Sequence, residues 1–319
     1  ELRFIELFAG IGGFRYGLER ANDNQKTRGC RQKTDVFEQG SGDVSSQSDK
    51  RQYSFTCVYA NEIDKYACKI YRKNYGNEEL TEGDIRAIPA KAIPNHDMLT
   101  AGFPCQSFSI AGKRKGFKDT RGTLFFEICR IAEKKQPSFL LLENVKGILN
   151  HESGKTFGII LDSLSELGYD CEWQVHNSKN FGVPQNRERV FIIGYRRGAG
   201  RGKIFPLQED DRIFNEKNKT NQRPSQARYS RTLRGTEMKA DHTFILQNNK
   251  AKAITPKTRA GDTFILNNKL RRLTPTECER LQGFPDGWTE GISDTQRYKC
   301  LGNAVTTNVI TEIGKAIIL

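Results

Sequence analysis

The sequence lacks the apolar segment that a membrane-spanning helix requires, because no hydrophobic run approaches the roughly 20 residues that cross a bilayer. It also lacks the basic lead and cleavage site of a signal peptide, since residues 1–8 enter an apolar strand pattern directly. None of the eight cysteines forms a Cys-x-x-Cys pair, so the sequence does not support a zinc-ribbon site or a thioredoxin-like redox site. With 36% hydrophobic and 28% charged residues, the composition is typical of a soluble globular protein. We therefore expect a cytoplasmic protein with reduced cysteines and no metal.

The 319-residue chain is strongly basic, with a formal net charge of +13. Positive charge gathers in residues 195–270 and in a short run around Asp119, which consists of Lys113, Arg114, Lys115, Lys118 and Arg121. An excess of this size favours a polyanionic partner. A solvated basic surface is the alternative. Because both clusters flank the candidate chemistry, we expect a nucleic acid.

Strand-like apolar segments alternate with helix-like segments over the first 195 residues. This alternation predicts an α/β fold with a doubly wound, mainly parallel sheet. The predicted strands cover 2–8, 55–61, 97–101, 138–142, 172–177 and 190–195, and the predicted helices cover 14–20, 64–75, 124–134 and 155–167.

Two stretches depart from that pattern. Residues 22–52 are polar and without periodicity, which predicts an inserted surface loop. After about residue 195 the chain becomes basic and rich in Asn, which predicts a second, smaller domain of short strands and loops. Further helices are expected over 275–281 and 303–318. The predicted domains are 1–194 completed by 296–319, and 195–295.

A glycine-rich turn follows the first predicted strand. Gly10, Gly12 and Gly13 stand where the chain must turn sharply and where a ligand could approach the backbone closely. The turn fits a dinucleotide, another nucleoside, or no ligand at all. Glu62 ends the second strand, where an acidic side chain can accept both ribose hydroxyls, and Asp84 follows a third strand end, within reach of an adenine amino group. Each carboxylate could instead cap a helix.

Cys105 follows Gly102-Phe103-Pro104 at the end of a predicted strand. A cysteine reacts as the thiolate, which nearby positive charge or a helix terminus stabilises, and the basic run at 113–121 is close in sequence. An isolated cysteine is more often a buried inert thiol. Cys105 is therefore a candidate nucleophile only in combination with the other motifs.

A carboxyl group and two arginines stand at two further strand ends. Glu143 follows the strand 138–142, where a carboxyl in a partly apolar pocket can serve as a proton donor. Arg187 and Arg189 point the same way if their segment is extended. They could hold a carbonyl and a phosphate, or simply pair with Glu188.

Six short motifs occur in the order typical of bacterial cytosine-5 DNA methyltransferases, and the sequence resembles that family over about two thirds of its length. They are Phe8 to Phe14, Gly102 to Gln106, Glu143 to Val145, Gln185 to Arg189, Arg272 to Pro275 with Phe284 and Pro285, and Gly302 to Val305. The resemblance implies a Rossmann-like fold that uses S-adenosylmethionine and transfers its methyl group to carbon 5 of cytosine, with S-adenosylhomocysteine as product. The insertion at 22–52 is not part of the family's core pattern.

The resemblance also implies a mechanism. The Cys105 thiolate would add to carbon 6 of the base, while Glu143 supplies a proton or a hydrogen bond at ring nitrogen 3. Arg189 would hold the 2-carbonyl group, and Arg187 would support Glu143 or the backbone. The target base must leave the duplex to reach Cys105, so base flipping is implied.

The remaining site residues are carried over from the family's motifs. Glu62 would bind ribose, Ile63 would lie against adenine, and Asn303 would lie near the methionine part. The implied cofactor-binding residues are Phe8, Gly10, Ile11, Gly12, Gly13, Glu62, Ile63, Asp84, Ile85, Pro104 and Asn303. Residues 106–124 would form a mobile loop that closes over DNA. The implied DNA-binding residues are Gln106, Ser109, Lys113, Arg114, Lys115, Arg121 and Gln185.

The resemblance implies a monomer in the bacterial cytoplasm, associated with the nucleoid. Its partner is double-stranded DNA, with a separately acting restriction endonuclease as a second partner and no membrane. Residues 195–270 would recognise a target sequence that we cannot read. Three alternatives stay open: a tRNA cytosine-5 methyltransferase, a nicotinamide-dependent oxidoreductase and a non-catalytic DNA-binding relative. The oxidoreductase leaves Cys105 and Glu143 unexplained, and a mere binder needs neither residue.

Overall fold

The computed structural model describes residues 1–31, 54–104, 124–198, 204–207, 243–245, 263–266, 269–271 and 273–318. Residues 23–31 and the three short segments from 243 to 271 are described as backbone only. Cys105 and the basic run at 113–121 therefore lie outside the described residues, as does Arg272.

The large sheet has seven strands in the order β3-β2-β1-β4-β5-β7-β6. The strands β1 to β5 run parallel, and β7 is antiparallel to both β5 and β6. The chain moves outward from β1 to β3 and then returns to β4 on the other side of β1, which makes a topological switch point between β1 and β4. The strands are β1 (Leu2–Leu7), β2 (Phe55–Glu62), β3 (Leu80–Glu82), β4 (Met98–Gly102), β5 (Phe139–Val145), β6 (Tyr169–Asn177) and β7 (Glu188–Arg196).

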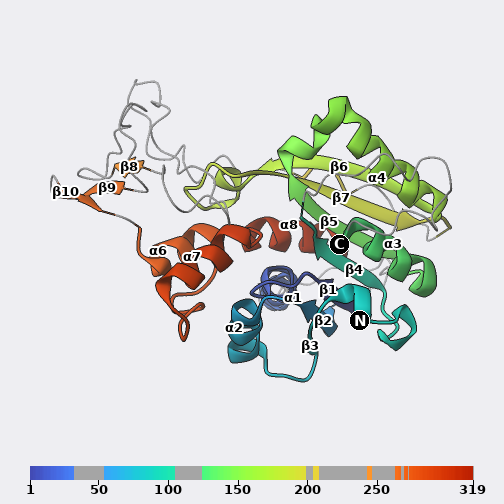
Figure 1. The fold of residues 1–319 in the computed structure, drawn as a ribbon, viewed down its shortest axis with the longest axis horizontal. Helices are drawn as coiled ribbons and strands as arrows, with labels where there is room; N and C mark the ends of the chain where they lie inside the picture. The colour runs from blue at the N-terminus through green and yellow to red at the C-terminus, as the bar shows by residue number, and fades with distance from the viewer. Residues whose placement is uncertain are drawn as a thin grey trace, which may run out of the picture.

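Helices cover both faces of this sheet (Figure 1). The α-helices are α1 (Gly13–Arg31), α2 (Lys65–Tyr75), α3 (Leu124–Lys135), α4 (Lys155–Glu166), α6 (Pro275–Gln282), α7 (Asp294–Asn303) and α8 (Thr307–Ile318). Short 3₁₀ helices are η1 (Ile85–Ala87), η2 (Ala90–Ala92), η5 (Lys146–Leu149), η6 (His151–Gly154) and η7 (Ser178–Phe181). The doubly wound, mainly parallel architecture predicted from the alternation is confirmed.

The central strands are apolar along their whole length because both of their faces are buried. Alternate residues point to opposite faces, so Leu99 and Leu140 pack with helices α3 and α4, while Met98 and Leu141 pack with α1 and α8. The two apolar clusters therefore form separate layers, one on each side of the sheet.

The first and the last described helices pack tightly against each other. A Cβ added at Gly17 in α1 would approach the backbone oxygen of Thr307 to 2.9 Å. The Thr311 hydroxyl of α8 donates a hydrogen bond to the carbonyl oxygen of Gly17 at 3.0 Å. Only glycine at position 17 allows this close approach, which completes the layer formed by α1 and α8.

Three expectations from the sequence need correction. Helix α1 continues to Arg31, so the start of the segment predicted as a loop at 22–52 is helical, and residues 32–53 lie outside the described part. The helix predicted over 303–318 begins at Thr307, because Asn303 ends α7, a helix that the sequence pattern did not reveal. Residues 273–294, which we assigned to the smaller domain, include Leu273 and Trp288 in one apolar cluster with Ile70 of α2.

A separate three-stranded sheet lies at the other end of the molecule (Figure 1), within the region predicted as a smaller domain. It consists of β8 (Thr243–Ile245), β9 (Thr263–Leu266) and β10 (Lys269–Arg271), with β9 in the middle. The pair β8 and β9 is parallel and the pair β9 and β10 is antiparallel. None of the helices in the described ranges is both long and apolar enough to cross a membrane.

Candidate active site

The glycine-rich turn connects the carboxyl end of β1 to the start of α1. Phe8, Gly10 and Gly12 all have positive φ angles, of 55°, 55° and 82°. A side chain at Gly12 would overlap the ring of Tyr75, whereas a Cβ at Gly10 would meet nothing within 4 Å. The turn is therefore closed toward α2 and open at Gly10, which is the side that a ligand could occupy.

Glu62 fixes the open side of the turn. Its Oε2 atom accepts a hydrogen bond from the backbone N–H of Gly10 at 2.7 Å. Its Oε1 atom accepts the backbone N–H groups of Ile63 at 2.9 Å and Asp64 at 2.8 Å. A carboxylate offers about four acceptor positions, so these three bonds leave about one, on Oε2, for a ligand hydroxyl group. Ile63, with 64% of its surface exposed, presents an apolar side chain beside this carboxylate.

The other residues predicted to bind the methyl donor differ in the solvent exposure of their side chains. The Asp84 side chain caps η1 and forms an ion pair with Arg86 at 2.5 Å, and the hydrogen bond from Arg86 lowers the pKa of Asp84. The side chains of Ile11 and Ile85 are buried in apolar clusters, so only their backbone atoms remain for a ligand. Asn303, at the end of α7, is exposed.

Glu6 lies beneath the turn, and sequence reasoning did not select it. Its side chain is fully buried, and its Oε1 atom accepts the backbone N–H of Phe14 at 3.0 Å. Burial raises the pKa of this carboxyl to about 8, although hydrogen bonds from the backbone of Phe14 and Arg15 oppose that shift. The sequence signal was a single acidic residue in a strand whose only other charged residue is the exposed Arg3.

The segment that leads to Cys105 is held by Asn144. The Asn144 side-chain amide donates to the carbonyl oxygen of Phe103 at 2.9 Å, and its oxygen accepts the backbone N–H of Val145 at 2.8 Å. Asn144 is almost completely buried, so both bonds are shielded from water. This amide therefore fixes the last residues of the described chain before Pro104 and Cys105.

Glu143 lies beside the same segment. Gly102 of β4 and Glu143 of β5 are partners in the parallel register. A Cβ at Gly102 would lie 3.4 Å from Glu143 Oε2 and 3.6 Å from the ring of Phe14 in α1. Gly102 thus stands where the glycine turn, the candidate proton donor and the approach to Cys105 meet.

The two arginines have different partners. Arg189 Nε forms an ion pair with Glu143 Oε1 at 2.9 Å. The guanidinium of Arg187 donates to the carbonyl oxygens of Gly302 at 3.1 Å and Ala304 at 2.8 Å. Burial lowers the pKa of Arg187, and the nearby charge of Arg189 acts in the same direction. The hydrogen bonds to Gly302 and Ala304 are to the backbone, while the charge of Glu143 acts on Arg187 in the opposite direction to burial, so both supports that we weighed for Arg187 stay predictions.

Gln185, predicted to contact DNA, is buried in this structure, and its contact with DNA stays a prediction. It is fully buried, and its side-chain amide donates to the carbonyl oxygen of Leu281 at 2.8 Å. The alternation that buries Gln185 and Arg187 exposes Asn186 and Glu188, so the amide points into the protein. The other predicted DNA-binding residues lie outside the described residues: Gln106, Ser109, Lys113, Arg114, Lys115 and Arg121.

The described part of the chain contains no group of three or more His, Cys, Asp or Glu side chains arranged to hold a metal ion. Among the predicted site residues, Glu143 and Arg189 are brought into direct contact, as are Gly10 and Glu62.

Comparison with known proteins identifies the family. The family model for C-5 cytosine-specific DNA methylase matches residues 2–261 and 203–319. The Type II methyltransferase M.HhaI of Haemophilus parahaemolyticus is 35% identical over 98% of this chain and 93% of its own length. The Type II methyltransferase M.NgoBI of Neisseria gonorrhoeae is 38% identical over 96% of this chain and 90% of its own length.

Solved structures share the fold. The methyltransferase Dnmt2 of S. pombe aligns with a TM-score of 0.67 at 19% identity and covers 100% of this chain and 98% of its own. A putative DNA modification methyltransferase of an E. coli prophage aligns with a TM-score of 0.61 at 20% identity, covering 99% of this chain and 98% of its own. With the family model spanning nearly the whole sequence, the chain belongs to the C-5 cytosine-specific DNA methylase family and is a DNA cytosine-5 methyltransferase.

Proposed function

We propose that this enzyme methylates a cytosine flipped out of a specific double-stranded DNA sequence, with S-adenosylmethionine as donor and Cys105 as nucleophile. The observation that carries this proposal is the arrangement at the ends of β4 and β5. Asn144 binds the carbonyl group of Phe103, two residues before Cys105, while the adjacent Glu143 is paired with Arg189. A carboxyl group is therefore held beside the chain segment that leads to a thiol.

The glycine turn and its neighbours fit S-adenosylmethionine. The space beside Gly10 is open, Glu62 keeps an acceptor position for a ribose hydroxyl, and exposed Ile63 offers an apolar surface to adenine. Asp84, as the cap of η1, keeps a carboxylate that could accept from the adenine amino group. The donor supplies an electrophilic methyl group when it is bound.

The chain's own residues would prepare the base for that methyl group. The Cys105 thiolate forms a bond to carbon 6, and Glu143 donates a proton to ring nitrogen 3, which makes carbon 5 electron-rich. Arg189 holds Glu143 and, on the side facing the base, the 2-carbonyl group. After carbon 5 has taken the methyl group, its proton passes to water and the carbon–sulfur bond breaks, which restores the Cys105 thiolate. The proton on ring nitrogen 3 returns to the Glu143 carboxylate as the methylated base is released.

The biological setting is proposed from the relatives. Those cited above are named Type II methyltransferases, which supports a role in a restriction-modification system beside a separate endonuclease. We infer a monomeric enzyme of the bacterial cytoplasm that acts at the nucleoid. Residues 195–270 would contain the part that recognises the target sequence.

The test is covalent trapping on duplex DNA that carries 5-fluorocytosine, with S-adenosylmethionine present. Fluorine cannot leave carbon 5 as a proton does, so we expect a stable protein–DNA adduct with the wild type. Cys105→Ala should give no adduct and no methylation while it still binds S-adenosylhomocysteine. An adduct with that variant, or methyl transfer to tRNA in place of duplex DNA, would contradict the proposal. Bisulfite sequencing of DNA from an expressing host would then identify the target.

A further inference from the structure

Two successive carbonyl groups of the glycine turn accept hydrogen bonds from aromatic side chains of other elements. The indole N–H of Trp288 donates to the carbonyl oxygen of Ile11 at 3.0 Å. The hydroxyl group of Tyr75, the last residue of α2, donates to the carbonyl oxygen of Gly12 at 3.1 Å. The two bonds hold the peptide groups between Gly10, where the turn is open, and the start of α1.

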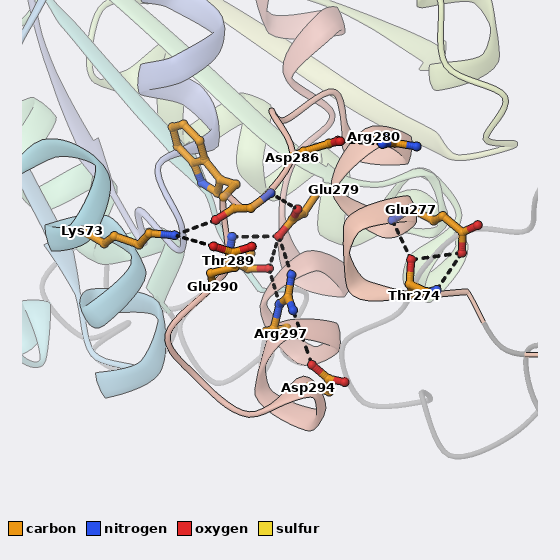
Figure 2. Close-up of polar contacts among 12 residues, drawn as sticks. Lys73, Thr274, Glu277, Glu279, Arg280, Asp286, Thr289, Glu290, Asp294 and Arg297 are labelled. Atoms are coloured by element: carbon orange, nitrogen blue, oxygen red, sulfur yellow. Dashed lines mark hydrogen bonds and ion pairs between the residues drawn. The ribbon is translucent and has the colours of Figure 1, made fainter.

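The loop that carries Trp288 is fixed by one buried carboxylate. Glu279 of α6 is fully buried, and its two oxygens accept the backbone N–H groups of Gly287 and Thr289, each at 2.8 Å. Arg297 of α7 pairs with the same carboxylate at 3.1 Å. Figure 2 shows Glu279 between Thr289 and Arg297. The backbone is therefore held on both sides of Trp288.

The indole ring has little freedom to turn. Only 8% of Trp288 is exposed. Lys73 of α2 donates from its ammonium group to the carbonyl oxygen of Gly287 at 2.6 Å, which ties the loop to α2 (Figure 2). Three aromatic rings pack against the indole with centroid distances of 4.9, 5.6 and 5.1 Å, namely Tyr16, Tyr75 and Phe284.

We propose that Trp288 is a positioning residue for the methyl donor, which acts by holding the Ile11 carbonyl and with it the glycine turn. The inference rests on the donor site proposed above. Removing the indole N–H leaves a buried carbonyl oxygen without its donor and frees a turn that contains three positive φ angles. We expect the effect on donor affinity, because Trp288 contacts the glycine turn, α1 and α2. The groups next to the reacting base are elsewhere: Glu143 is on β5, and Phe103 follows β4.

The test variant is Trp288→Phe, which keeps an aromatic ring in the cluster but removes the N–H donor together with part of the buried indole volume. We expect the KM for S-adenosylmethionine to rise about tenfold, as for the loss of one hydrogen bond to a buried acceptor. The Kd of S-adenosylhomocysteine, measured by calorimetric titration without DNA, should rise by a similar factor. The kcat and the KM for DNA should change by less than about twofold, because uniform binding of the donor is lost and the chemistry is not.

The matched control is Trp173→Phe. Trp173 is the other of the two tryptophans and is 46% exposed on β6, so this variant should keep the wild-type KM and Kd. If Trp288→Phe does not fold, Tyr75→Phe tests the second bond to the turn. The Gly12 carbonyl keeps the backbone N–H of Tyr16 at 3.0 Å, so the Kd should rise by a smaller factor than in Trp288→Phe, and an unchanged Kd would count against positioning of the turn by its carbonyl bonds. Unchanged KM and Kd in a folded Trp288→Phe, or a fall confined to kcat, would overturn the role of Trp288. Failure of the proposed donor site is distinguishable, because the wild type and Trp173→Phe would then not bind S-adenosylhomocysteine either.

Discussion

Arg189 and Glu143 form an ion pair in which Nε and Oε1 are 2.9 Å apart, and the two side chains expose only 11% and 13% of their surface. The pair lies across antiparallel strands: Arg189 is the register partner of Val145, which lies two residues after Glu143 and on the same face of β5. A charge held at this depth loses most of its contact with water, so removal of one partner leaves the other charge poorly compensated. The pair therefore sets the position of the candidate proton donor.

We predict that Arg189→Met lowers the rate of methylation at saturating donor and DNA by about 10²-fold, the lower range for loss of a positioned acid–base group. The reason is that Glu143 loses the partner that orients it. The measurement is single-turnover methyl transfer to duplex DNA, with calorimetric binding of S-adenosylhomocysteine expected to be unchanged.

The control for this change is Lys146→Met. Lys146 pairs with Glu188 at 2.9 Å, but both side chains are about half exposed, so the pair contributes only about 0–1 kcal/mol to stability. Methylation by Lys146→Met should stay within about twofold of the wild type. Equal losses in the two variants would mean that charge near these strand ends, rather than orientation of Glu143, sets the rate.

Asn144→Ala should slow covalent trapping by 5-fluorocytosine DNA and leave donor binding intact. The substitution removes the donor to the Phe103 carbonyl, which then remains buried without a partner, at a cost of about 1–3 kcal/mol of stability. The approach to Cys105 would then lose its fixed position. The trapping rate and a urea unfolding curve test this together, and a folded variant that traps DNA at the wild-type rate would refute it.

Gly10→Ala and Gly12→Ala should fail in different ways. Both positions have positive φ, so each substitution costs about 1–2 kcal/mol from backbone strain alone. Gly12→Ala adds a clash with Tyr75 and should lower the midpoint of thermal unfolding more. Gly10→Ala places a methyl group in open space that we propose for the donor, so it should weaken binding of S-adenosylhomocysteine more than it lowers stability. Calorimetric titration and thermal melts together separate the two effects. Binding of S-adenosylhomocysteine by Gly10→Ala with wild-type affinity would exclude this side of the turn as the donor site.

Glu6 should make stability depend on pH. Its pKa is about 8 in the folded protein against 4.5 for an ordinary glutamate, so the fold favours the protonated form. The stability that this group contributes is fully present below pH 4.5 and is lost as pH rises toward 8, by at most about 1.4 kcal/mol per pH unit. Glu6→Gln keeps a neutral acceptor for Phe14 and should flatten that dependence. Urea unfolding of both proteins at three pH values between 5.5 and 7.5 checks it, and parallel slopes would contradict the role of Glu6.

The sequence predicted most of the sheet because apolar runs that are buried on both faces differ clearly from the helices between them. It did not reveal α7, because a helix such as Asp294–Asn303 that mixes polar and buried residues has a weak apolar stripe. The extension of α1 to Arg31 was missed for the same reason, since its polar second half resembles a loop.

The sequence indicated which residues belong to the candidate site, but not which of them contact each other. The motifs pointed to Glu143, Arg187 and Arg189, yet only the register of β5 against β7 decides that Arg189 meets Glu143. The burial of Gln185 was not predictable, because the motif gives no sign of which alternate residues face the core. Glu6, Asn144 and Trp288 act through contacts that cross between elements, and no local pattern encodes such contacts.

The contact between α1 and α8 bears on how the protein is made. The bonded residues Gly17 and Thr311 are 294 positions apart. At a synthesis rate of about 5–20 residues per second, α1 leaves the ribosome roughly 15–60 s before its partner exists. During that interval the apolar face of α1 is open to chaperones that bind nascent chains. Assembly of the glycine turn with Trp288 likewise waits until residue 288 has left the ribosome, so chains that stall before that residue lack the hydrogen-bond donor to the Ile11 carbonyl.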